Sequence, residues 1–200
     1  MSDINMLWCI KKNRMNENKP LIIREMVKDD IEHFVKYWLE SSIEHLEGMG
    51  VDITKRPTKE QIEKLITDQL GVPMKNRKSY FLTWLVNNKP IGCSNVNQIE
   101  YGKKAFMHLH LWQTENRQRG IGTEFIKKSL PYFFDNLNLQ ELFCEPYSLN
   151  PAPNKIVEKI GFEFIKKYLT IPGASNFEQN VNQWKLTRKK YEEITHHNIG

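Results

Sequence analysis

The sequence has 200 residues, of which 40% are hydrophobic, and this is enough for one domain of ordinary size with a hydrophobic core. The net charge of +5 comes from scattered lysines and arginines, so it suits an anionic cofactor but does not indicate a nucleic-acid-binding protein. Because no apolar run approaches the roughly 18 residues of a membrane helix and no signal-peptide pattern opens the chain, we expect a cytoplasmic protein without a membrane partner.

The chain divides into three predicted parts: residues 1–19 are a polar extension, residues 20–190 form a single domain, and residues 191–200 form a C-terminal tail. Apolar periodicity and turn residues predict a series of strands and helices within the domain. The predicted strands span 21–24, 80–86, 91–99, 105–112, 141–145, 162–170 and 181–187, and the predicted helices span 29–48, 58–70, 120–135 and 150–161. This mixed order, with a hairpin in the middle, predicts an α/β (α+β) fold around one mixed sheet of about seven strands flanked by helices.

Three of the predicted helices begin at a capping signal. Asp29 followed by Glu32, and Thr58 followed by Gln61, have the form of capping boxes, in which two side chains satisfy backbone N–H groups reciprocally. Asn150 precedes a proline, which is tolerated at the first helical position because the N–H that it lacks has no partner there. We therefore expect these residues to fix the starts of three helices.

The stretch from Ala105 to Phe125 is the most informative part of the sequence. Its first part, up to Trp112, alternates apolar and mixed residues, as a strand with one apolar side does. After a short polar connection, Gly120 and Gly122 open an amphipathic helix. A helix start presents unpaired N–H groups and the positive end of a dipole, and glycines let a phosphate approach the backbone. The stretch therefore predicts an anion site at the start of this helix.

Two motifs together resemble a known family. The motif Arg117-x-x-Gly120-x-Gly122, directly after a strand and at the start of a helix, resembles the acetyl-CoA pyrophosphate motif of the GNAT superfamily of N-acetyltransferases. The later helix, with Gly161-Phe162 eleven residues after its asparagine cap, resembles the last helix of that superfamily. The resemblance spans roughly residues 21 to 187. It is closest to the branch that contains the ribosomal-protein-alanine N-acetyltransferases.

The resemblance implies that acetyl-CoA binds as co-substrate in a V between two central parallel strands that splay apart. The strand ending near Trp112 and the strand at 141–145 would form this V, and the pantetheine arm would pair with the first of them. A backbone N–H near Leu111 or Trp112 would polarise the thioester carbonyl. The other residues that the resemblance assigns to CoA are Arg117, Gln118, Arg119, Gly120, Ile121, Gly122 and Thr123 around the pyrophosphate, and Asn150 and Asn154 on the last helix.

Glu145 is the best candidate for a general base, acting directly or through water, although a charged strand end is the plain alternative. His110 and His108 share one face of the central strand, and either can relay a proton at neutral pH or contact the acceptor. A histidine in a strand is, however, more often a structural residue. No cysteine or carboxylate lies at a spacing that would complete a metal site with them, so we expect no metal.

The position of a general acid is open. The resemblance places a serine or a tyrosine on the last helix, but those positions hold Pro153 and Val157. Tyr147, in the loop before that helix, is a substitute candidate. The three cysteines are widely spaced without a CxxC motif, which argues against a zinc knuckle or a disulfide framework. Cys144, in mid-strand, is expected to pack rather than to react.

The first helices are expected to wall the acceptor site, where Glu40 and Glu44 would attract a cationic amine; a solvated helix face is the alternative. The predicted function is acetyl transfer from acetyl-CoA to a primary amine, of a small molecule or of a protein N-terminus, by direct attack in a ternary complex. The alternative is a non-catalytic module of the same fold that binds CoA as a regulatory ligand or binds another protein. A monomer and a homodimer both fit.

Overall fold

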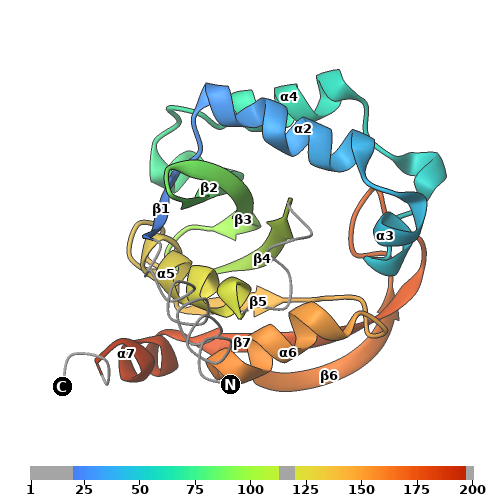
Figure 1. Cartoon of the computed structure of the whole chain (residues 1–200). Coiled ribbons are helices and arrows are strands. Elements are labelled where there is room, and N and C mark those ends of the chain that lie inside the picture. The colour runs from blue at the N-terminus through green and yellow to red at the C-terminus, as the bar shows by residue number, and fades with distance from the viewer. Residues whose placement is uncertain (1–19, 113–119, 197–200) are drawn as a thin grey trace, which may run out of the picture.

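The computed structural model describes residues 20–112 and 120–196, and Figure 1 shows the arrangement of their helices and strands. The strands are β1 (Leu21–Glu25), β2 (Ser79–Val86), β3 (Lys89–Glu100), β4 (Lys104–Leu111), β5 (Glu141–Cys144), β6 (Glu163–Thr170) and β7 (Gln179–Thr187). The α-helices are α2 (Ile31–Glu40), α3 (Ile43–Gly48), α4 (Lys59–Thr67), α5 (Ile121–Phe134), α6 (Pro151–Ile160) and α7 (Arg188–His196). Short 3-10 helices are η2 (Lys28–Asp30), η3 (Ile53–Lys55) and η4 (Met74–Asn76).

The strands form one seven-stranded sheet in the order β1-β2-β3-β4-β5-β7-β6. Neighbouring strands are antiparallel except β4 and β5, which are parallel. The predicted α/β fold around a mixed sheet is therefore confirmed. The predicted strands all form, with ends that differ by a few residues.

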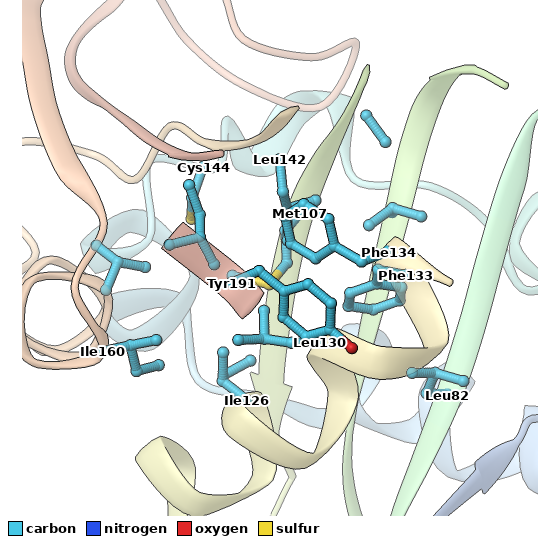
Figure 2. Close-up of a cluster of buried hydrophobic side chains, with 14 of the residues drawn as sticks. Leu82, Met107, Ile126, Leu130, Phe133, Phe134, Leu142, Cys144, Ile160 and Tyr191 are labelled. Atoms are coloured by element: carbon cyan, nitrogen blue, oxygen red, sulfur yellow. The ribbon is translucent and has the colours of Figure 1, made fainter. Parts of the chain in front are cut away.

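Helices cover the sheet on two sides, and each side has its own hydrophobic core. The larger core lies under α5 and α6, where Trp84 of β2 stacks on Phe125 at 5.0 Å between ring centroids. Figure 2 shows part of this core, with Met107 of β4, Leu142 of β5 and several α5 side chains converging. The smaller core lies under α2 and α4 and includes Phe81 and Cys93. In Figure 1, β2 and β3 lie between α2 and α5, so the sheet is the middle layer.

Two of the predicted helix starts agree with the structure. Thr58 caps α4 and forms a capping box with Gln61, with N–H···O distances of 3.3 and 2.9 Å. Asn150 caps α6 by accepting the Ala152 N–H at 3.3 Å, and Gly161 ends this helix with φ of +106°, a left-handed conformation that favours glycine. The starts of these two helices are thus set by short-range hydrogen bonds, which is why the sequence predicts them.

The helix predicted at 29–48 is two helices, and its predicted cap is wrong. Ser41 and Ser42 are extended, with ψ of 145° and 152°, and the Ser42 hydroxyl accepts the His45 N–H at the start of α3. Serine favours such caps over a helix interior because its side chain competes for backbone groups. At the start of α2, Asp30 rather than Asp29 is the buried carboxylate, and it accepts bonds from Arg24, the Val27 N–H and Thr83.

The chain beyond residue 187 forms a helix that the sequence analysis did not predict. Helix α7 spans the predicted domain boundary at residue 190. Tyr191 is 6% exposed, its ring stacks on that of Phe134 with 4.5 Å between centroids, and its hydroxyl donates to Asp135 at 2.8 Å. Figure 2 labels Tyr191 among the buried side chains of this core. The packed part of the chain therefore includes the first turn of the predicted tail. Polar residues dominate α7, so its apolar pattern is too short to be recognised.

Candidate active site

Strands β4 and β5 pair only at the start of β4, from Lys104 with Glu141 to Phe106 with Phe143. Beyond this point β4 continues to Leu111 beside β3, while β5 ends at Cys144. The Trp112 N–H donates to Ile91 O at 2.8 Å. The alternation of an antiparallel pair then directs the backbone groups of Leu109 and Leu111 away from β3, toward the side on which β5 diverges. The two parallel strands thus open as the resemblance implies.

The role predicted for the Trp112 N–H does not agree with this geometry, because that group is already bonded to β3. The Trp112 side chain belongs to the smaller core and stacks on His33 at 5.7 Å. The same role for the Leu111 N–H, which points toward the opening, stays a prediction.

Helix α5 begins at Gly120, whose φ of +71° is the left-handed conformation that glycine adopts readily. A Cβ at this position would meet no atom within 4 Å, so a phosphate has room to approach the backbone among the described residues. Ile121 and Gly122 lie in the first turn, whose N–H groups have no intrahelical partner. The Thr123 N–H, in contrast, donates to Gly120 O at 3.1 Å. Arg117, Gln118 and Arg119 lie outside the described residues.

Glu145 follows β5 directly, at the point where the two strands separate. Its Oε1 accepts hydrogen bonds from Tyr168 Oη of β6 at 2.7 Å and from Gln183 Nε2 of β7 at 2.6 Å. Its Oε2 has no hydrogen-bond partner within residues 20–112 and 120–196. Burial and Glu145 together raise the pKa of Tyr168 to about 12, so Tyr168 remains a donor over the physiological range. The carboxylate is therefore held by one oxygen, with the other available.

His110 and His108 lie on the face of β4 that is opposite α5. The His110 ring packs within 5.9 Å of the rings of Phe34, Tyr37 and Trp38 on α2. Burial lowers the pKa of His110 to about 3, so its ring is neutral and weakly basic at neutral pH. This disfavours His110 as the proton acceptor that the sequence suggests. His108 is exposed on the same face and stays a candidate for contacting the acceptor.

The residues predicted around the last helix have different environments. Asn154 is 9% exposed; its amide donates to Tyr147 O and Asn150 O, and its oxygen accepts from Asn182 and Trp184. These internal bonds give Asn154 a structural role, and its contact with CoA stays a prediction. Asn150 uses its side-chain oxygen to cap α6. The half-buried Tyr147 packs edge-on against Phe177 at 5.7 Å.

Glu40 and Glu44, which the sequence places on one predicted helix at 29–48, lie on two separate helices. Glu40 is the last residue of α2 and Glu44 lies in α3, beyond the extended serine pair. Both side chains are exposed. Their contact with a cationic acceptor stays a prediction.

Four polar residues of the site were missed by the sequence analysis: Tyr168, Gln183, Asn95 and Asn97. Asn95 and Asn97 alternate on β3, where Asn95 pairs with His108, and each has a buried side-chain oxygen without a hydrogen-bond partner. Polar residues at alternate positions of a strand signal a polar face, which makes these two recognisable. Tyr168 and Gln183 depend on the pairing of β5, β7 and β6, which no local pattern specifies.

Within the described ranges, no group of three or more His, Cys, Asp or Glu side chains is placed to hold a metal ion. No helix in those ranges is long and apolar enough to cross a membrane.

Comparison with known proteins adds a family and a fold. The sequence matches the acetyltransferase (GNAT) domain family over residues 20–163. Comparison with curated protein sequences finds no match. The fold is similar to that of a spermidine N-acetyltransferase from Vibrio cholerae in complex with CoA and spermine, with a TM-score of 0.69, 16% identity, and coverage of 86% of this chain and 98% of that chain. It is also similar to RimL, a ribosomal L7/L12 alpha-N-protein acetyltransferase in complex with CoA, with a TM-score of 0.70, 12% identity, and coverage of 87% and 97%.

Proposed function

Because the chain belongs to the GNAT acetyltransferase family, we propose that it transfers an acetyl group from acetyl-CoA to a primary amine held where β4 and β5 diverge. Membership makes the protein an acyl-CoA-dependent N-acetyltransferase with acetyl-CoA as its co-substrate. The observation that carries the proposed position of the reaction is the end of β4–β5 pairing at Phe106 and Phe143, directly before Glu145.

The residues around this opening fit an acetyl-CoA molecule. The open space over Gly120 and the N–H groups of the first turn of α5 suit a pyrophosphate. The backbone edge of β4 at Leu109 suits the amide groups of a pantetheine arm, which would add to the sheet as a short strand does. When bound, acetyl-CoA supplies the acetyl group as a thioester, and CoA leaves as a thiol. The chain holds both reactants side by side, which lowers the barrier through proximity.

Glu145 is the proposed general base. Tyr168 and Gln183 fix its Oε1, so that Oε2 takes one proton from the ammonium group of the acceptor and leaves the nitrogen a lone pair for attack. The nitrogen loses its second proton as the amide forms, and this proton replaces the one that a predicted donor side chain gives to the departing thiolate. Tyr147 remains the predicted donor for the thiolate, because Pro153 and Val157 offer no acidic group.

Primary amines of two kinds are acceptors of the enzymes with similar folds, a polyamine in one case and a protein N-terminus in the other. Both kinds fit direct attack beside Glu145. The proposed acceptor is therefore a primary amine.

The proposed cofactor site is tested by Gly120→Glu with acetyl-CoA titrated calorimetrically. The new carboxylate should occupy and repel the pyrophosphate position, lowering affinity by about a hundredfold or more, which is a loss of about 3 kcal/mol. Gly71→Glu is a matched control, since Gly71 has φ of +74° and, like Gly120, no atom within 4 Å of the position that a Cβ would take. Unchanged affinity in Gly120→Glu would show that the site is wrong.

A further inference from the structure

Two segments that are far apart in the sequence are bonded to each other on the acceptor side of the site. Residues 50–52 follow α3, and residues 175–179 lead from the β6–β7 loop into β7; we call the bonded pair the strap. Gly50 O accepts from Asn176 Nδ2 and from Gln179 Nε2, both at 2.8 Å, and the Asp52 N–H donates to Ser175 O at 2.8 Å. The strap therefore joins the segment after α3 to the segment before β7 by hydrogen bonds.

The strap is a packed structure rather than a surface contact. Val51 is 3% exposed and Gln179 is 4% exposed, and Val51 forms an antiparallel bridge with Asn176. Gly50 has φ of +87°, and a side-chain carbon there would collide with the amide of Gln179. Only glycine therefore fits this position without displacing the strap.

The strap contacts the segment after β5 directly, and it is connected to β4 through α3 and α2. On one side, Phe177 packs against Tyr147, two residues after Glu145. On the other side, His45 of α3 bonds to Tyr37 Oη at 3.1 Å, and the Tyr37 ring lies 5.4 Å from the His110 ring of β4. Figure 1 shows the β6–β7 loop passing beside α3. The acceptor side is thus bounded by β4, α3, the strap and the end of β5.

We propose that the strap restricts the acceptor to a primary amine at the end of a slender, unbranched chain, and that it excludes amines carried by peptides and folded proteins. A peptide has side chains and a broad backbone next to its terminal amine, so it must displace the strap to reach Glu145. An aliphatic diamine has only methylene groups there. The unpartnered oxygens of Asn95 and Asn97 on the same face suit the multiple N–H donors of such an amine. This inference rests on the proposed function.

The test compares two acceptors in one assay that measures release of free CoA thiol. The probes are 1,4-diaminobutane and an unstructured ten-residue peptide with a free N-terminal alanine. We expect the wild type to favour the diamine by at least about tenfold in kcat/KM. Gly50→Ala should reduce this preference at least about threefold while leaving the diamine within about twofold of the wild type. Gln179→Leu, which removes one bond to Gly50 O at similar volume, should act in the same direction.

Gly71→Ala is the matched control, because it imposes the same positive-φ strain with no atom nearby. Hydrogen exchange at the Asp52 amide, measured separately, should become faster in Gly50→Ala and remain unchanged in Gly71→Ala. The proposal is overturned if the wild type acetylates the peptide as well as the diamine, or if both strap variants keep the wild-type preference although Asp52 exchanges faster. Failure to bind acetyl-CoA would instead contradict the proposed function itself.

Discussion

The two faces of the sheet differ in whether their buried polar groups have hydrogen-bond partners. On the α5 and α6 face, Trp84 Nε1 donates to Ser94 and Ser129 at 3.0 and 3.3 Å, and the Asn154 amide is satisfied on all sides. On the α2 face, buried atoms of Asn95, Asn97 and His110 have no partner among the described residues. A polar group left unpaired in a protein interior destabilises the fold by about 1–3 kcal/mol.

This difference indicates which face evolved for packing and which for binding. The paired groups of the first face add to stability. The unpaired groups of the second face lie beside the opening between β4 and β5, where an acceptor amine would supply the missing donors. The following predictions test this contrast, in order of decreasing effect.

The largest effect is expected for Glu145→Gln, which removes the proposed base and keeps its shape. The kcat should fall by about a thousandfold, while acetyl-CoA affinity stays within about twofold. Steady-state kinetics and calorimetry measure the two quantities. Glu141→Gln is the control, because Glu141 lies on β5, four residues before Glu145, and pairs with Lys185 at 3.2 Å. Equal kinetics for the wild type and Glu145→Gln would remove Glu145 from the mechanism.

A large difference in stability is expected between two asparagine variants. Asn154→Ala leaves Trp184 Nε1 and Asn182 Nδ2 without their acceptor, so the free energy of unfolding should fall by about 3 kcal/mol. Asn95→Leu removes an oxygen that has no partner and should change it by less than about 1 kcal/mol. Urea denaturation gives both values. Similar losses in the two variants would show that the faces do not differ as argued.

A pH effect is expected from His110, whose pKa burial lowers from 6.5 to about 3. The unfolded chain takes up a proton as the pH falls through 6.5 while folded His110 stays neutral, so acid destabilises the fold. Between pH 6.5 and pH 4.5, His110→Phe should lose about 1 kcal/mol less per pH unit than the wild type does. Because His108 and His45 face the ring in both proteins, the difference isolates His110. If the free energies of unfolding of the wild type and of His110→Phe change equally with pH, His110 is not buried as described.

The smallest effect is expected for Tyr168→Phe, which removes one of the two donors to Glu145 while Gln183 keeps the other. The kcat should fall by about three- to tenfold with little change in the KM for acetyl-CoA. Adding Tyr168→Phe to Glu145→Gln should have no further effect if Tyr168 acts through Glu145. An additive loss in the double variant would assign Tyr168 a separate role.

The sequence predicts the parts of the molecule that depend on local signals. The hairpin of β2 and β3, the caps at Thr58 and Asn150, and the strand and glycine turn before α5 follow from alternation and turn chemistry. The break at Ser41 was missed because apolar residues continue at helical spacing across it. The contacts of the site residues were harder to predict. The hydrogen bonds that hold the Glu145 carboxylate, for example, come from residues 23 and 38 positions away in the sequence.

The same limit applies to Asn154. The sequence places it on α6, either in contact with the cofactor or facing solvent, and it does not reveal that Asn182 and Trp184 on β7 engage its side chain. Such bonds form only when the sheet order places β7 beside β5, which periodicity does not reveal. Asn95 and Asn97 show the opposite case, because their alternation is visible in the sequence but their lack of partners is not.

The central claim is that acetyl-CoA binds in the opening between β4 and β5, and a crystal structure of the complex with CoA tests it most directly. In that structure we expect the pantetheine arm alongside Leu109, the pyrophosphate at the first turn of α5, and the thiol near Glu145 Oε2. CoA bound elsewhere on the molecule, with the β4–β5 opening filled by side chains, would contradict it.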